Sequence, residues 1–402
     1  MQKIKKTCIM LCFLALLLVL FLSSNAEASP SLTFIDPTPD DNDFQTNNFV
    51  EINVSIREEN LTRVLYNWSG VNYTIYNESL VLMINFDNQN SLGENYGSED
   101  STVVDLSVHE NNGTTKNSLG SSWNSGKYNG AFDFDGNDDT IDFGSQSLLQ
   151  ITGDLTVECW AKYDSLGSSN TMISQGTSTD DGESDPYNML YILRLKSNKV
   201  VSLFWEYGDG YNVDATSTSI PDVSSQEWHH YAAVRNASTK KVFFYVDGEQ
   251  LGNEVSYSQN PEDGSSGVFT IGSEYQTWSY PIGYYNCFNG AIDEVRVWDR
   301  CLSSDEVYQE YASNLNKSNQ TNWYLYVNQS KNSAEELDDG AYIYQAFATD
   351  TSSNTNSTEQ RTVYVNVEPT PPVPEAQTFI LFGLGTLFFI AIITKKGGVD
   401  SE

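Results

Sequence analysis

The strongest constraint on the fold is the repeated use of short segments in which apolar and polar residues alternate with a period of two. GAIDEVRVWDR, LTVECWAKY and KKVFFYVDGEQL all show this alternation. Successive side chains of a β-strand point to opposite faces, so the pattern is typical of strands with a buried face. Turn signals such as Asp247-Gly248 separate these segments. The sequence therefore predicts an all-β chain of antiparallel hairpins.

Composition limits the classes of partner. The chain has 402 residues, which favours more than one domain. Its net charge of −33 comes from 54 acidic and 21 basic residues. Nucleic acid is excluded as a partner, because phosphate binding needs clustered Lys and Arg. Calcium is the ligand class that such an acidic composition favours.

The first residues predict export rather than fold. Lys3, Lys5 and Lys6 precede an apolar stretch, and Ala26-Glu27-Ala28 supplies a small-residue cleavage motif. We therefore expect residues 1–28 to be a signal peptide. The cysteines beyond it are Cys159, Cys287 and Cys301. Cys159 is expected to be a buried thiol, and the fold is not expected to depend on disulfides.

The other end predicts a membrane anchor. Residues 369–377 form a Pro-rich linker, and the apolar residues 378–394 are at the short limit for a transmembrane helix. A tail, 395–402, begins with two lysines, which gives the positive cytoplasmic flank. This order resembles the C-terminal sorting signals of the PEP-CTERM type, in which a sortase-like enzyme removes the tail. The motif region is Val373-Pro374-Glu375, and Ala376 departs from the usual pattern.

Potential N-glycosylation triplets gather in two segments. An Asn-rich chain makes such triplets by chance, but chance alone would scatter them. Here most of them lie in residues 53–77 and 316–356. The predicted glycan acceptors are Asn53, Asn60, Asn67, Asn72, Asn77, Asn316, Asn319, Asn328 and Asn356.

Residues 30–80 and 318–368 each hold strand-like segments, such as NFVEINVSIRE and NWYLYVNQS. Each half is too short to close a sandwich core by itself. The segment LDDGAYIYQAFATD resembles the late strands of immunoglobulin-like and fibronectin-type domains. We therefore expect one immunoglobulin-like domain split by an insertion. Two separate small β modules are the alternative.

The insertion, residues 81–317, carries a series of distinctive phrases. In order they include YNGAFDFDGNDDTIDFG, LTVECWAKY, EWHHYAAVRN, KKVFFYVDGEQL and GAIDEVRVWDRCLSSDEV. Together they resemble the LamG-like group of laminin G and concanavalin A-like domains. The resemblance implies a jelly roll of two curved antiparallel sheets packed face to face.

The functional prediction is adhesion or carbohydrate recognition at the cell surface, with a surface glycan or protein as ligand. Glycosidases of this architecture use two acids on one strand face, as in E-x-D-x-E, and no such run occurs. His229 and His230 are adjacent on a predicted strand and point apart, which disfavours a zinc site. We therefore expect no enzyme. A surface glycan hydrolase and a purely structural envelope component are the alternatives.

Aromatic residues gather in two Gly-rich segments, FWEYGDGYN and EYQTWSYPIGYY. Exposed aromatic faces suit sugar rings, because they offer flat apolar area with polar edges. Burial in the core is the alternative. The predicted ligand platform consists of Trp205, Tyr207, Tyr211, Trp278 and Tyr280, with Tyr284 and Tyr285 beside it.

Asp293 poses a specific question, because period two places it on the face of Val295 and Val297. A buried carboxylate needs a cation or several hydrogen-bond donors. Jelly rolls of the LamG-like kind commonly hold a structural calcium, so Asp87, Asp105 and Asp293 are predicted to converge on one calcium ion. The alternative is a carboxylate held by backbone N–H groups at a strand edge.

Overall fold

The computed structural model describes residues 29–177, 189–208, 211–220, 223–262, 267–277 and 282–367. The predicted signal peptide, linker and membrane segment lie outside these ranges. Strands dominate the described residues, which contain one α-helix, α2 (Ser304–Ala312). Within these ranges, no helix has both the length and the apolar character needed to cross a bilayer. The fold is all-β, as predicted.

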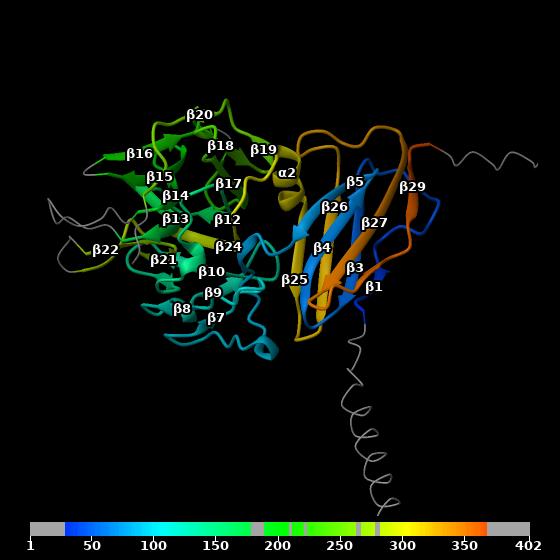
Figure 1. The fold of residues 1–402 in the computed structure, drawn as a ribbon, viewed down its shortest axis with the longest axis horizontal. Coiled ribbons are helices and arrows are strands. Elements are labelled where there is room, and N and C mark those ends of the chain that lie inside the picture. Colours follow the sequence, from blue (N-terminus) through cyan, green and yellow to red (C-terminus); the bar gives the residue numbers. More distant parts are fainter. Residues whose placement is uncertain are drawn as a thin grey trace, which may run out of the picture. The chain divides into compact units, whose positions relative to one another are not determined.

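The middle of the chain forms a jelly roll of two packed sheets (Figure 1). The nine-stranded sheet holds β6 (Leu80–Ile84), β9 (Trp123–Ser125), β10 (Gly130–Asp135), β12 (Leu155–Tyr163), β17 (His229–Asn236), β18 (Lys241–Val246), β19 (Glu249–Gln250), β20 (Val255–Ser256) and β24 (Asn289–Trp298). The eight-stranded sheet holds β7 (Thr102–Val103), β8 (Gly113–Lys116), β11 (Thr140–Asp142), β13 (Ser169–Gly176), β14 (Tyr191–Lys196), β15 (Val201–Tyr207), β16 (Tyr211–Thr216) and β21 (Val268–Ile271). β22 (Glu274–Gln276) and β23 (Gly283–Tyr285) form a separate hairpin, and the short 3-10 helices are η1 (Asn90–Leu92), η2 (Leu119–Ser121) and η3 (Ser147–Leu149).

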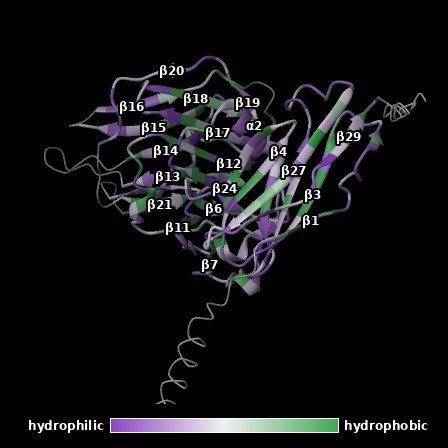
Figure 2. Ribbon diagram, turned by 45° about the vertical axis from the view of Figure 1, so that its right-hand side comes forward, coloured by the Kyte–Doolittle hydropathy of each residue, from purple (hydrophilic) through white to green (hydrophobic). Residues whose placement is uncertain are grey.

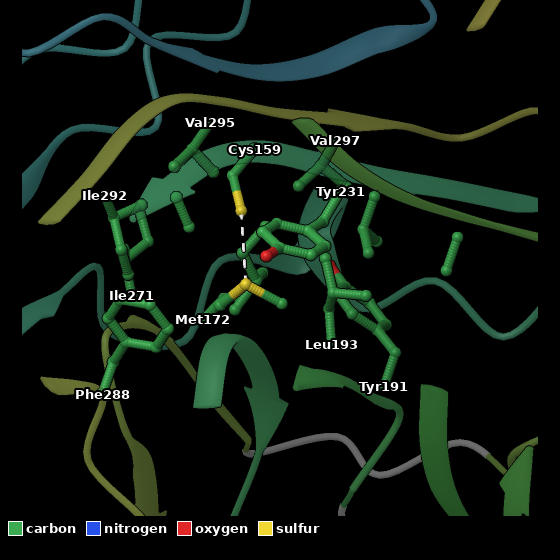
Figure 3. Close-up of a cluster of buried hydrophobic side chains, with 14 of the residues drawn as sticks. Cys159, Met172, Tyr191, Leu193, Tyr231, Ile271, Phe288, Ile292, Val295 and Val297 are labelled. Carbon is green, nitrogen blue, oxygen red and sulfur yellow. Dashed lines mark hydrogen bonds between the residues drawn. The ribbon is translucent and has the colours of Figure 1, made fainter. Parts of the chain in front are cut away.

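The core of the jelly roll lies between these two sheets. Cys159 of β12 and Met172 of β13 meet there, with their sulfur atoms 3.8 Å apart (Figure 3). Tyr191 and Tyr231 enclose them from β14 and β17 (Figure 3). Cys159 is fully buried and free, as the sequence predicts. Alternation on the facing strands therefore fills one continuous apolar layer.

A β-bulge in β24 overturns the predicted face of Asp293. β12 pairs with β24 in a register that shifts between Glu158 and Trp160, and Glu294 has φ 47°. The extra residue returns Val295 to the core side occupied by Ile292 (Figure 3). Asp293 consequently lies on the opposite face from the valines. Strict period two fails at this one position.

The two ends of the described chain form a second pair of sheets, named here the terminal sandwich. Its four-stranded sheet holds β1 (Ser31–Ile35), β3 (Val50–Arg57), β26 (Asn322–Gln329) and β25 (Ser313–Lys317). Its six-stranded sheet holds β2 (Asp43–Gln45), β29 (Arg361–Val365), β27 (Gly340–Asp350), β4 (Leu61–Trp68), β5 (Val71–Tyr76) and β28 (Thr355–Ser357). β3 pairs with β26 and β4 with β27, so each sheet combines strands from both ends. β25, which the predicted boundary at residue 317 assigns to the insertion, belongs to this sandwich.

Apolar residues of both sandwiches share a second core cluster. Trp298 and Val234 from the jelly roll belong to it together with Val64 and Trp323 of the terminal sandwich. Hydrophobic segments run along the strands of both sandwiches in Figure 2. Helix α2 contacts β5, β25 and β26 of the terminal sandwich and β19 of the jelly roll. Its first turn carries a capping box in which Ser303 and Glu306 satisfy each other's backbone N–H groups.

Candidate functional site

Trp205 of the predicted platform is a core residue instead. Its side chain is 0% exposed, and its indole N–H donates to the Gln259 carbonyl at 2.9 Å. Alternation on β15 places it on the core side with Val201 and Leu203. A ring enclosed in this way cannot stack on a ligand, so this part of the prediction is wrong. Burial of Trp205 in the core is the alternative that the sequence analysis gives.

Tyr207 and Tyr211 do form an aromatic surface. They face each other across the β15–β16 pair with ring centroids 5.9 Å apart and an interplanar angle of 21°. Tyr211 is 64% exposed. Trp278 and Tyr280 lie outside the described residues. Tyr284 does not join this pair: its hydroxyl donates to the Asp142 carboxylate at 2.8 Å.

Asp105 does not take part in a three-carboxylate site. One carboxylate oxygen accepts the backbone N–H groups of Met83 and Ser107, each at 2.9 Å. The other accepts the Ser107 hydroxyl at 2.7 Å and the Asn111 N–H at 2.8 Å. These four donors fix the loop after β7 against β6. The predicted convergence of Asp87, Asp105 and Asp293 is therefore wrong: Asp105 holds a loop.

Of the three predicted calcium ligands, Asp87 and Asp293 remain as candidates. Asp293 accepts the backbone N–H groups of Tyr128 at 3.0 Å and Glu294 at 2.8 Å, as the alternative reading expects. Asp87 binds the Asn85 and Asn129 amides through Oδ2, while its buried Oδ1 makes no hydrogen bond of good geometry within the described residues; the Gly130 backbone N–H also favours the ionised form of this carboxylate. Burial raises the pKa of Asp87 to about 7, and burial with repulsion from Glu294 and Asp87 raises the pKa of Asp293. An orphaned carboxylate oxygen beside a second carboxylate fits a hard divalent cation.

Another acidic group occupies the β10–β11 turn. Ligand oxygens of Asp135, Asp138 and Asp139 lie within 4.8 Å of one another. Asp135 accepts the Asn137 backbone N–H at 2.8 Å, and Asp139 accepts the Asp135 N–H at 3.1 Å. These hydrogen bonds are those of an Asx-stabilised turn, which accounts for the acids without a ligand.

Several aromatic residues line a cleft of about 350 Å³. We call it the aromatic cleft. Its lining comes from the loop before β10, from β12, from α2, and from β26 with the loop that follows it. The described lining residues are Lys127, Tyr128, Trp160, Tyr308, Tyr311, Ala312, Tyr326, Asn328, Ser330 and Ser333.

The aromatic rings of the cleft contact one another. Trp160 is stacked on Tyr311, with centroids 5.4 Å apart and an interplanar angle of 25°. Tyr128 meets the edge of Trp160 at 6.2 Å and packs against Tyr326 at 6.4 Å. Trp160 itself is buried, whereas Tyr128, Tyr311 and Tyr326 are half-buried. The three tyrosines therefore keep part of their rings accessible at the cleft, and Trp160 packs against Tyr128 and Tyr311.

Polar groups border these rings. The Lys127 ammonium lies 4.0 Å from the Trp160 ring centre, which is a cation–π contact. Burial lowers the pKa of Lys127, and the nearby Asp247 and Asp293 carboxylates oppose this shift. On the other side, Tyr308 and Ser330 share a hydrogen bond of 2.8 Å between their hydroxyls. A flat apolar floor with hydroxyl, amide and ammonium groups at its edge suits a hydroxyl-rich ligand.

Sequence reasoning missed this cleft, although two signals were present. Alternation in LTVECWAKY places Trp160 on the face opposite Cys159, away from the core. Tyr308 and Tyr311 are three residues apart, a spacing that puts them on one face of a helix. Neither pattern indicates that β12, α2 and β26 meet, because that depends on packing between the two sandwiches.

A larger hollow, of about 460 Å³, lies near β4, β7 and β26. Acidic Glu59, Asp105 and Glu110 line it with Lys317. Its aromatic members Tyr76 and Trp323 are each 2% exposed. It therefore offers a ligand polar groups but no aromatic face.

The predicted glycan acceptors all lie within the described residues, and none is buried. Asn60, Asn72, Asn328 and Asn356 are exposed, and the others are half-buried. Of this set, Asn328 lines the aromatic cleft.

The jelly roll matches a known family. Residues 135–308, from the end of β10 into α2, match the Laminin_G_3 family model, described as the concanavalin A-like lectin/glucanases superfamily. The jelly roll has the concanavalin A-like lectin/glucanase fold. No curated protein matches the chain.

Solved structures show weaker likenesses. Domain 4 of AbnA, an extracellular arabinanase from Geobacillus stearothermophilus solved with arabinotriose, is 19% identical, with a TM-score of 0.37 over 57% of this chain and 96% of that one. The CBM40 module of a Ruminococcus gnavus IT-sialidase, solved with α2,3-sialyllactose, is 17% identical, with a TM-score of 0.33 over 40% and 82% of the two chains. A SAP-like pentraxin from Limulus polyphemus is 17% identical, with a TM-score of 0.30 over 39% and 68%.

Proposed function

We propose that this protein is an exported, membrane-tethered surface glycoprotein that binds carbohydrate through the aromatic cleft between its jelly roll and its terminal sandwich. The terminal sandwich is then an immunoglobulin-like stem, interrupted by the binding module. Export and anchoring rest on the two ends of the sequence. The ligand is a surface glycan, and the role is adhesion or recognition.

The observation that carries the proposal is the set of tyrosine rings over buried Trp160. Tyr311 is stacked on Trp160, so its ring is held in a fixed orientation. Rigid aromatic faces bind sugar rings at low entropic cost, because few side-chain torsions are lost. The cleft volume of about 350 Å³ falls within the range of ligand pockets, roughly 300–1,000 Å³.

A glycan array on the chain produced in a host that does not N-glycosylate, followed by titration with the best saccharide, tests this function. Tyr311→Ala should weaken binding at least tenfold, because it removes the tyrosine ring that Trp160 holds in place in the cleft. Tyr211→Ala is the matched control, because Tyr211 is an exposed tyrosine that does not line the cleft. The opposite ranking would assign binding to the Tyr207–Tyr211 pair, which is the second candidate surface.

The hydrolase alternative requires two carboxylic acids flanking a glycosidic bond. The described lining of the aromatic cleft supplies tyrosines, amide and hydroxyl groups, and Lys127 instead. This supports binding without turnover. Release of shorter saccharides from the best array ligand, measured by mass spectrometry, would contradict it.

Calcium is proposed as a structural ion held by Asp87 and Asp293. It would neutralise the repulsion between the two carboxylates and supply a partner for the buried Asp87 Oδ1. Asp293 also holds the backbone N–H of Tyr128. The ion would in this way support one wall of the cleft.

A further inference from the structure

We propose that Asn328 carries an N-linked glycan whose first sugar rings lie in the aromatic cleft, so that this glycan and a free saccharide exclude each other. The inference rests on the proposed function, because both ligands use the same tyrosine faces. It assigns to the chain a modification that controls access to its own binding site.

The position of the acceptor carries the proposal. Asn328-Gln329-Ser330 is an N-x-S triplet at the end of β26. Gln329 is 4% exposed and points inward, whereas Asn328 is exposed. Both Asn328 and Ser330 line the aromatic cleft, as does Tyr326. Residues two apart on a strand share a face about 6–7 Å apart, so a sugar on Asn328 starts beside the Tyr326 ring.

The other exposed acceptors lack this setting. Asn72 lies on β5 beside the β4–β5 turn, and its side-chain oxygen accepts the Asn67 amide at 2.6 Å. The Asn356 amide donates to the Pro30 carbonyl at 2.9 Å. Neither lines the aromatic cleft. Exposed Asn60 lines the larger hollow, where Tyr76 and Trp323 are buried. Of the exposed acceptors, Asn328 is therefore the one whose glycan begins within reach of stacked tyrosines.

The modification is a group transfer without redox change. The donor is a lipid-phosphate-linked oligosaccharide. The Asn328 amide nitrogen forms a bond to the anomeric carbon of the first sugar and loses one proton. The bond from that carbon to the phosphate oxygen breaks, and the lipid phosphate leaves with its electron pair. The linkage retains one amide N–H, and the attached sugar brings hydroxyl groups to the rim of the cleft.

The test compares tyrosine reactivity in the full chain produced by a host that glycosylates N-x-S/T triplets. Glycopeptide mass spectrometry should find Asn328 occupied. Nitration of Tyr311, measured per peptide against exposed Tyr211 in the same sample, should be at least fivefold slower in the wild type than in Asn328→Gln. Asn72→Gln from the same host should keep the wild-type protection. In saccharide titrations, the wild type from a host without N-glycosylation should bind and the glycosylated wild type should not.

The nitration readout needs no free ligand, so the two proposals can fail separately. An unmodified Asn328, or equal Tyr311 nitration in wild type and Asn328→Gln, overturns the inference whatever the titrations give. If Tyr311 is protected by the glycan but the unglycosylated chain binds no array saccharide, the inference stands and recognition of foreign glycans fails.

Discussion

At the scale of single residues, Arg235 explains why Trp205 is unavailable to ligands. Its fully buried guanidinium donates to the carbonyls of Gly153, Leu190 and Ile151 at 3.1, 2.9 and 2.7 Å. It also lies 5.4 Å from the Trp205 ring centre. Burial lowers the pKa of Arg235 to about 10, so it remains a cation at neutral pH. Trp205 thus completes the enclosure of a buried charge.

Replacing Arg235 by an uncharged residue should strongly lower the stability of the folded protein. Arg235→Met leaves three carbonyl groups without a donor, and we expect a loss of about 3–5 kcal/mol in the free energy of unfolding. Urea unfolding measures it. Arg194→Met is the control: it removes a partly exposed arginine whose partner is Asp214, and should cost about 1 kcal/mol or less. Similar losses for both variants would contradict the role given to Arg235.

The acids of the jelly roll make a second residue-scale prediction. Calcium should raise the melting temperature of the wild type, and a chelator should reverse this, because the ion binds the folded state. Asp293→Asn should abolish the calcium response. Asp105→Asn should lower stability by roughly 2–4 kcal/mol through lost hydrogen bonds yet keep the response. A response that survives in Asp293→Asn but is absent in Asp105→Asn would reverse our assignment.

At the scale of elements, helix α2 meets the nine-stranded sheet through buried charges. Arg296 of β24 faces three carboxylates, those of Glu310 on α2, Glu294 and Glu158. The first two form ion pairs with it. Burial raises the pKa of Glu310 to about 8, and Arg296 opposes that shift. Burial raises the pKa of Glu294 to about 8 as well, so Arg296 faces two buried acids that release their protons less readily than exposed glutamates.

This arrangement predicts a pH dependence of stability. The folded state holds the Glu310 proton up to about pH 8, whereas an unfolded glutamate loses it near 4.5. The stabilisation is therefore complete below pH 4.5 and declines as the pH rises towards 8. Urea unfolding between pH 5 and 8.5 should show a decline of about 1–3 kcal/mol, reduced in Glu310→Gln. Exposed Glu335→Gln should leave the slope unchanged, and an unaltered slope in Glu310→Gln would refute the prediction.

The same elements show how far the sequence predicts the structure. Alternation predicts the strands and the burial of Cys159, and the order of motifs predicts the concanavalin A-like jelly roll. Strict period two misassigns Asp293, because the bulge at Glu294 shows in the sequence only as a spacing of three between the core residues Ile292 and Val295. The cleft was hidden: Trp160, Tyr311 and Tyr326 come from separate elements, and only tertiary packing brings them together.

At the scale of the whole molecule, the shared core cluster predicts cooperative unfolding. Trp298 of β24 is fully buried in it with residues of the terminal sandwich. Circular dichroism and tryptophan fluorescence should report one coincident transition. Trp298→Ala should lower stability by about 3–5 kcal/mol without splitting that transition, and exposed Tyr324→Ala should have little effect. Two resolved transitions in the wild type would show that the sandwiches unfold independently.

In the terminal sandwich, strands from the two ends of the chain pair with each other. The N-terminal strands are therefore synthesised well before their C-terminal partners. Thr62 on β4 donates to the Thr349 carbonyl on β27, a contact that spans 287 residues. Synthesis at about 5–20 residues per second takes roughly 15–60 s to cover that distance. During this interval β3 and β4 lack their partners β26 and β27. The acceptors Asn53, Asn60 and Asn67 lie on or between these two strands. A glycosylating enzyme that follows the emerging chain meets these acceptors before folding can restrict access to them.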